Sequence, residues 1–233
     1  TTGTASGKTL AFNLPVLELD TDELGDPRYS ANPSNRCYFC KMELWSRLVP
    51  VARARGLAAV VDGTNADDLI DHRPGRKAAS EHGVASPLAE LGFSKSDIRE
   101  LSRLRSIPTW SQPSSPCLAS RIPYGTEVTP LRLAKVEASE RAIRALGIGG
   151  DVRVRFFGKT ARVELALGEL DRWRTAGGRR AIRDAVTAAG FDHVELDLRG
   201  FRTGSMNRAD ELPVLEELDA EISTPRAASG TVA

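Results

Sequence analysis

The side chains best suited to chemistry in this sequence are its three cysteines. Cys37 and Cys40 form a Cys-x-x-Cys pair, Cys117 lies far downstream in a Ser/Pro-rich stretch, and there is no fourth cysteine. Such spacing is typical of one metal-binding or sulfur-handling site built from two distant segments. Three buried thiols with only a packing role explain the spacing alone equally well.

Length and composition narrow the class of protein. The 233 residues, 41% hydrophobic and 27% charged, suffice for one large domain or two small ones. A net charge of +1 gives no global attraction to nucleic acid or an anionic membrane, so we expect neither partner. There is no membrane-length apolar run and no signal-peptide pattern, and the odd cysteine count disfavours a secreted disulfide framework. We therefore expect a cytoplasmic protein.

The first residues resemble a phosphate-binding loop. Residues 2–9 read Thr-Gly-Thr-Ala-Ser-Gly-Lys-Thr, as in the first motif of superfamily 2 helicases, and an apolar stretch follows. In such loops backbone N–H groups cradle phosphates and the threonine holds magnesium. No Walker B segment, DEAD-type box or later helicase motif follows, so we do not expect a working ATP site from this segment.

The elements around the cysteine pair are predicted from periodicity. Apolar residues at helical spacing predict a helix from Cys40 to Gly56, with both thiols at its entrance, where the N–H groups and the dipole stabilise thiolates. A buried parallel strand is predicted at residues 57–61. The polar loop at residues 62–68 would then follow a strand, where α/β sheets bind nucleotides and magnesium. A turn and helix cap explain this loop equally well.

The second half of the chain reads as a small α+β domain. A strand is predicted where apolar residues (Val152, Val154, Phe156) alternate with Arg153 and Arg155. This alternation predicts one apolar and one basic face. Further strands are predicted at residues 161–167 and 194–198. Helices are predicted, in both halves of the chain, at residues 76–81, 94–104, 130–146 and 168–189, the last with a break at 177–178. An extended segment is predicted at 86–88.

Several stretches taken together resemble one family. They are Asn35-Arg36-Cys37-Tyr38-Phe39-Cys40-Lys41, residues 62–68, Arg73-Pro74-Gly75, residues 115–125, Val152-Arg153-Val154-Arg155 and residues 200–207. In order and spacing, from about residue 19 to residue 207, they resemble the LarE family of ATP-dependent sulfur transferases in nickel-pincer cofactor assembly.

The resemblance implies an α/β fold with two domains and a tail. Residues 1–126 would form a truncated PP-loop ATP pyrophosphatase-like domain with a partial Rossmann-like (adenine nucleotide alpha hydrolase-like) parallel sheet. Residues 127–207 would form a smaller α+β domain for substrate binding and oligomerisation, and residues 208–233 a flexible tail. The family's PP-loop is replaced by the helicase-like segment, so we expect adenylation to be impaired. Because members of the family associate into hexamers, the resemblance also implies a homo-oligomer.

The resemblance also implies a reaction. ATP would adenylate a carboxylate of a nucleotide substrate, pyridinium-3,5-biscarboxylic acid mononucleotide, and sulfur would then displace AMP to give a thiocarboxylate. Cys37, Cys40 and Cys117 would be catalytic and would bind a [4Fe-4S] cluster with one open iron. The other route in the family sacrifices the sulfur of Cys117 itself.

Further residue roles are implied by the same resemblance. Nucleotide and Mg²⁺ would be contacted by Asp62, Gly63, Thr64, Asn65 and Asp67. Substrate phosphate and carboxylates would be held by Ser120, Arg121, Arg153, Arg155 and Arg202, since arginine binds such anions through paired hydrogen bonds. Glu140 matches an acidic position near the active site and would be catalytic, with a solvated helix face as its alternative. For Arg153 and Arg155 the alternative is a polar sheet face.

Two rival functions remain open. One is another PP-loop enzyme such as a tRNA thiolase, and a bulky basic extension for RNA would favour it. The other is a non-catalytic helicase fragment or fusion, and ATP hydrolysis that depends on nucleic acid would favour that.

Overall fold

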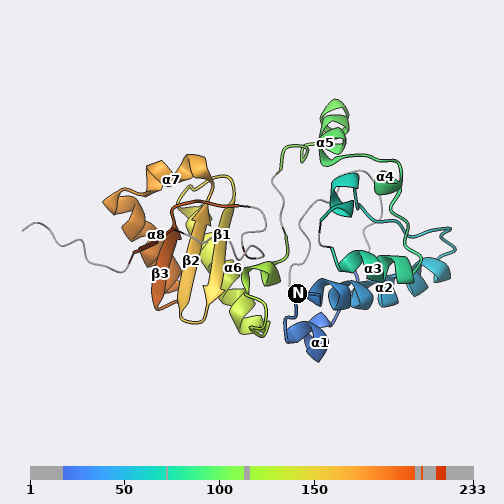
Figure 1. Cartoon of the computed structure of the whole chain (residues 1–233), viewed down its shortest axis with the longest axis horizontal. Helices are drawn as coiled ribbons and strands as arrows, with labels where there is room; N and C mark the ends of the chain where they lie inside the picture. Colours follow the sequence, from blue (N-terminus) through green and yellow to red (C-terminus); the bar gives the residue numbers. More distant parts are fainter. Residues whose placement is uncertain (1–17, 72, 113–115, 203–205, 207–213, 219–233) are drawn as a thin grey trace, which may run out of the picture. The chain divides into compact units, whose positions relative to one another are not determined.

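The computed structural model describes residues 18–71, 73–112, 116–202, 206 and 214–218, and two compact units form within them. The first unit runs to Ser120 and includes Tyr124–Pro130, while the second contains Arg121–Pro123 and the residues from Leu131 onward. Figure 1 shows that the first unit is mainly helical and that the second holds the sheet. The helicase-like segment at residues 2–15 lies outside the described residues.

The first unit is organised around helix α2. Its helices are η1 (Glu23–Gly25), α1 (Pro27–Ser30), α2 (Arg36–Ala54), η2 (Ala66–Leu69), α3 (Gly75–Glu81), α4 (Pro87–Glu90) and α5 (Lys95–Leu104), and η3 (Leu118–Arg121) leads out of the unit. Helix α2 packs on α3, and its buried Trp45 and Val49 form a core with Ala78, Ala79 and Val84. It begins a turn before the predicted start, so it contains both cysteines, and Gly56 follows it with φ of +68° as predicted.

The predicted buried strand at residues 57–61 is wrong. Only Val61 pairs, in a single parallel bridge to Ala85, and Leu57 and Val61 are 59% and 58% exposed. A strand needs a continuous ladder with a neighbour and a cover on its faces, and the described residues provide neither here. The parallel sheet expected in the first domain is therefore absent from the described part of the chain.

Local signals predicted the other helices of this unit better. Helix α3 matches the prediction, and α5 begins at the predicted capping box, in which the Ser94 hydroxyl accepts from the N–H of Asp97 (3.1 Å). The extended segment predicted at 86–88 is instead the start of α4, because Pro87 occupies a first-turn position where its missing N–H costs nothing.

The second unit contains a mixed sheet with strand order β1-β2-β3-β4. The strands are β1 (Val152–Phe157), β2 (Thr160–Leu165), β3 (His193–Asp197) and β4 (Leu215–Glu217), and the helices are α6 (Pro130–Ala145), α7 (Leu167–Trp173) and α8 (Ala176–Ala188). The β1–β2 and β3–β4 pairs are antiparallel, whereas β2 and β3 are parallel because α7 and α8 carry the chain back between them. The α/β class and the three predicted strands are confirmed.

The core of the second unit is aliphatic. Side chains of α6 (Val136, Ile143) and α8 (Ile182, Val186) are as fully buried as those of the strands (Val152, Val154, Val163, Leu165, Val194, Leu196). The rings of Phe156 and Phe191 add an edge-to-face contact with centroids 5.8 Å apart. This apolar packing fixes the frame on which the charged side chains of β1 are carried.

Two predictions for this unit need correction. The helix break falls at residues 174–175 rather than 177–178, because the Thr175 hydroxyl caps α8 by accepting from the N–H of Gly178 (3.2 Å). Strand β4 lies in the stretch predicted as a flexible tail, and Leu218 beside it is 6% exposed. No helix among the residues described above is long and apolar enough to cross a membrane.

Candidate functional site

The three thiols all lie in the first unit. Helix α2 carries Cys37 and Cys40 on its first two turns, and Cys117 directly precedes η3, where its carbonyl accepts from the N–H of Ser120 (3.0 Å). Cys37 and Cys117 are exposed and Cys40 is half-buried. Cys117 acts electrostatically on both of the other thiols, so the two distant segments meet in one region.

The surroundings keep the paired thiols protonated. Burial raises the pKa of Cys40 to about 12, and Glu23 and Cys117 add to that rise. For Cys37 the largest cause is also desolvation of its sulfur, although the residue as a whole is exposed, and its pKa is raised too. The basic residues that oppose this rise are Arg36, Arg73 and Lys41. The predicted stabilisation of thiolates at the helix entrance is therefore wrong, because desolvation of the sulfurs outweighs the nearby positive charges.

The thiols fit a sulfur-ligated metal centre by donor chemistry more than by present arrangement. Among the residues that the structure describes, no three Cys, His, Asp or Glu side chains are placed to hold a metal ion. Three interacting thiols are nonetheless the donor set of an iron–sulfur cluster with one open iron. The ligand assignment of Cys37, Cys40 and Cys117 stays a prediction, and it requires the thiols to draw together on binding.

The Arg73-Pro74-Gly75 turn packs against the start of α2. A Cβ atom on Gly75 would lie 2.8 Å from Cγ of Lys41 and 3.3 Å from the carbonyl oxygen of Cys37, so glycine allows this close approach. Arg73 forms ion pairs with Asp68 and Asp71, each 3.0 Å long. The turn thereby ties the polar loop of residues 62–71 to the cysteine-bearing end of α2.

The predicted nucleotide loop is closed by its own hydrogen bonds. Asp62 Oδ1 accepts from the N–H of Thr64 (3.0 Å) and from the Ser86 hydroxyl (2.8 Å). The Asn65 side chain caps η2 by accepting from the N–H of Asp67 (3.0 Å), as in the turn-and-cap alternative.

Some of the loop remains available to a ligand. A Cβ atom on Gly63 would meet nothing within 4 Å, and Thr64 lines a hollow of about 340 Å³ with Arg76 and Ser86. Asp67 Oδ2, however, accepts from the N–H of Lys95 (2.8 Å). These carboxylates do not by themselves fit a magnesium site.

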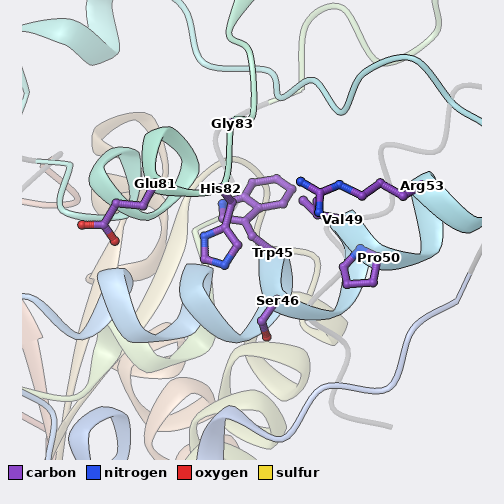
Figure 2. Close-up of a pocket in the computed structure, with 8 residues that line it drawn as sticks. All are labelled: Trp45, Ser46, Val49, Pro50, Arg53, Glu81, His82 and Gly83. Carbon is purple, nitrogen blue, oxygen red and sulfur yellow. The ribbon is translucent and has the colours of Figure 1, made fainter.

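A second hollow of the first unit, of about 500 Å³, contains no predicted site residue. It lies between α2 and the end of α3, and Figure 2 shows the residues that surround it. They are Trp45, Ser46, Val49, Pro50, Arg53, Glu81, His82 and Gly83. The lining mixes both charges with apolar side chains, and this mixture does not point to one class of ligand.

The arginines predicted to hold anions are in the second unit, where each is paired with a carboxylate. The pairs are Arg121–Glu140 (2.8 Å), Arg153–Asp151 (3.0 Å), Arg155–Glu164 (2.7 Å) and Arg202–Asp197 (3.3 Å). Arg121, Arg153 and Arg155 are only 3–5% exposed. The basic face of β1 is thus buried and ion-paired, contacts that a polar sheet face would also make, and the anion-binding role of these residues stays a prediction.

The arginines also act on one another. Burial is the largest cause that lowers the pKa of Arg153, and the charges of Arg121 and Arg155 lower it further. The Arg153 guanidinium lies 4.7 Å from the centre of the ring of Phe201, which is the residue before Arg202. Ser120, the remaining predicted ligand, is half-buried in the preceding turn of the first unit. The structure therefore gathers Arg121, Arg153 and Arg155 into one cluster.

Glu140 holds this cluster to α6. Its carboxylate accepts from Nε (2.8 Å) and Nη2 (3.1 Å) of Arg121 and from the backbone N–H of Val154 (3.0 Å). The alternative of a solvated helix face is wrong, because Glu140 is 8% exposed. The carboxylate orients Arg121 and covers a backbone donor of the edge strand β1.

Sequence reasoning named Glu140, the partner of Arg121, but missed the acidic partners of Arg153, Arg155 and Arg202 and one further arginine. Glu164 lies opposite Arg153 in the β1–β2 register and pairs diagonally with Arg155. The charged residues Arg162 and Glu164 alternate along β2 with the same period as in β1, and that alternation could have predicted the pairing. Arg36, buried beside the cysteines, offered no signal beyond its position before Cys37.

Comparisons with known proteins test the family resemblance that the motifs indicated. No family model matches the chain. It is 44% identical over 190 residues to an uncharacterized protein of Synechocystis, an alignment that covers 82% of this chain and 70% of that protein. It is 39% identical over 186 residues to the pyridinium-3,5-bisthiocarboxylic acid mononucleotide synthase of Lactiplantibacillus plantarum, covering 80% of this chain and 66% of the synthase. The chain belongs to the LarE family.

A third relative, an uncharacterized protein of Methanocaldococcus jannaschii, is 29% identical over 198 residues, which are 85% of this chain and 73% of that protein. The chain thus spans about two thirds of the length of these three relatives. The family resemblance is confirmed, and the named relative favours neither a tRNA thiolase nor a helicase fragment. The three-cysteine type and the replaced PP-loop stay predictions.

Proposed function

We propose that this chain transfers sulfur to an activated carboxylate, as a pyridinium-3,5-bisthiocarboxylic acid mononucleotide synthase or the sulfur-transferring part of one. Its likeness to the named synthase supports the reaction class. The structural observation that carries the proposal is that all three cysteines belong to one unit, where Cys117 acts electrostatically on Cys37 and Cys40.

The reaction needs a leaving group before sulfur can enter. A substrate carboxylate attacks the α-phosphorus of ATP and expels pyrophosphate, which leaves an acyl adenylate. A sulfur nucleophile then attacks the acyl carbon, and AMP departs with the former carboxylate oxygen. We place the nucleotide at the hollow beside Thr64, where Arg76 and hydroxyl side chains could meet phosphates and whose volume of about 340 Å³ lies in the range of ligand pockets.

The paired arginines suit a substrate that carries a phosphate and carboxylates. Arg121, Arg155 and Arg202 present planar guanidinium groups, which bind such anions through parallel hydrogen bonds. Their carboxylate partners fix the orientation of each fork, as Glu140 does with two contacts to Arg121. The partners would therefore act as positioning residues for the guanidinium groups.

The thiols would supply the sulfur. A [4Fe-4S] cluster held by the three thiolates would keep one iron open for an exogenous sulfide. Because burial raises the pKa values of Cys37 and Cys40, both thiols must lose protons when they bind metal. If Cys117 itself were the donor, its Cβ–S bond would break with loss of the α-proton, and the residue would become dehydroalanine.

Anaerobic reconstitution with iron and sulfide tests this proposal. We expect the wild type to take up a stoichiometric cluster, read by visible absorption and iron content, and Cys117→Ala to lose it. Ser46→Ala, on the same helix as the cysteine pair, is the matched control. A cluster that persists in Cys117→Ala would overturn the ligand assignment, and an intact mass that falls by one H₂S after turnover would assign the sulfur to Cys117.

A further inference from the structure

Arg36 is a buried cation for which the described residues provide no acid. It is 4% exposed, its Nη1 donates to Oδ1 of Asn32, and its guanidinium lies 5.3 Å from the centre of the Tyr124 ring. Its Nε is buried and has no hydrogen-bond partner within the described part of the chain. The other buried arginines of the described residues all form ion pairs with carboxylates: Arg121, Arg153 and Arg155.

A buried charge with only neutral partners is costly. An amide oxygen and an aromatic face offset part of the lost hydration of a guanidinium, and a carboxylate or another anion would offset far more. Glu23, a buried acid of the same unit, forms no ion pair with Arg36 and instead acts on Cys40 and Tyr29. The protein therefore carries a fixed positive charge that its own described acids leave uncompensated.

The position of Arg36 indicates where the compensating anion belongs. Arg36 opens α2, immediately before Cys37 and one turn before Cys40. Among the basic groups that lower the pKa of Cys37, Arg36 has the largest effect, so its guanidinium is close to that sulfur. Of the other two, Arg73 is paired with acids and Lys41 is exposed, so neither needs an anion at the thiols.

We propose that Arg36 is a positioning residue of the thiol site, whose buried charge is neutralised when Cys37, Cys40 and Cys117 lose their protons and form an anionic centre with a soft metal ion. This inference rests on the proposed function in one respect, that the three thiols bind together. Three thiolates and one divalent metal ion carry a net negative charge, and Arg36 supplies the opposite charge beside them. The same arginine is a burden to the fold as long as the thiols are neutral.

If Arg36 has both effects, replacing it should weaken metal binding without lowering the melting temperature of the metal-free protein. In reduced protein treated with a chelator, Arg36→Met is expected to keep or raise the melting temperature, because it removes an uncompensated buried charge. In a titration with Cd²⁺ alone, followed by thiolate-to-metal absorption, the same variant should bind at least about tenfold more weakly. Arg36→Lys keeps the charge and should bind nearly as the wild type does.

The controls separate the possible failures. Arg47→Met changes an exposed arginine of the same helix, which is paired with Glu43, and should alter neither measurement. If Arg36→Met lowers the melting temperature and leaves Cd²⁺ affinity unchanged, Arg36 is only structural and the inference is overturned. Arg36→Gln replaces Met if that variant does not fold. Wild-type protein that binds Cd²⁺ no better than Cys117→Ala would refute the three-thiol ligand set of the proposed function, and the inference with it.

Discussion

Removing the carboxylate of Glu140 should destabilise the second unit strongly. Glu140, on α6, accepts two hydrogen bonds from Arg121 and joins α6 to β1 through one from the N–H of Val154. The Arg121 and Glu140 side chains are only 3% and 11% exposed, so solvent screens the pair little. Glu140→Ala would leave a buried guanidinium and a buried N–H group without this acceptor.

The expected cost follows from that geometry. Breaking a buried ion pair by removing one partner costs about 3–5 kcal/mol, of which the Val154 hydrogen bond accounts for about 1 kcal/mol. In a unit of about 100 residues each kcal/mol lowers the melting temperature by about 4–8 °C, so the shift should be roughly 12 °C or more. Glu140→Gln keeps an acceptor and loses the charge, so its cost should be about 1.5–3 kcal/mol.

Thermal and urea unfolding, followed by circular dichroism, measure these differences. Glu137→Ala is the matched control, because Glu137 is exposed on the same helix and its loss should cost no more than about 0.5 kcal/mol. If Glu140→Ala is as stable as this control, Glu140 does not hold Arg121, and the placement of the arginine cluster is refuted.

Three further predictions concern the thiols, the turn beside them and the arginine cluster. Burial raises the pKa of Cys40 from 9.0 to about 12, so the unfolded chain loses its proton first and stability should fall by roughly 1.4 kcal/mol per pH unit between these values. Cys40→Ala should flatten that decline in pH-dependent unfolding, and an unchanged slope would count against the burial of the thiol. Gly75→Ala should cost about 1–3 kcal/mol because α3 must move away from α2, whereas Gly63→Ala, which meets open space, should cost nothing measurable. Arg155→Met alone should cost about 3–5 kcal/mol, while adding Glu164→Leu should recover most of it; a double variant as unstable as the single one would contradict a buried pair.

Local sequence signals were sufficient where a few neighbouring residues decide the structure. Ser94 with Asp97, and Gly56 or Gly147 after a helix, act within one turn, so the ends of α5, α2 and α6 could be predicted. The alternation of β1 likewise predicted a strand, although it could not show that its second face is buried. That burial depends on acids from other elements, such as Glu164 and Glu140.

The errors share one physical origin, which is dependence on distant partners. Residues 57–61 have the composition of a buried strand, but a strand forms only where another strand offers a ladder. Within the described part of the chain only Ala85 pairs with them. The thiols were placed at a helix entrance that favours thiolates, but burial together with Glu23 and Cys117 reverses the direction. Neither effect is encoded within a window of ten or fifteen residues.

The two groups of arginines treat negative charge in opposite ways. In the cluster, each buried arginine is paired with a carboxylate, namely Arg121, Arg153 and Arg155 with Glu140, Asp151 and Glu164, so its net charge is close to zero. Such a cluster would orient a bound anion through directed hydrogen bonds more than it would attract it by net charge. Arg36 has no such acid among the described residues and lies beside Cys37 and Cys40, whose pKa values are raised mainly by burial. Under our proposal, the centre that the thiols bind completes the charge balance there, so Arg36 favours the binding of metal rather than folding.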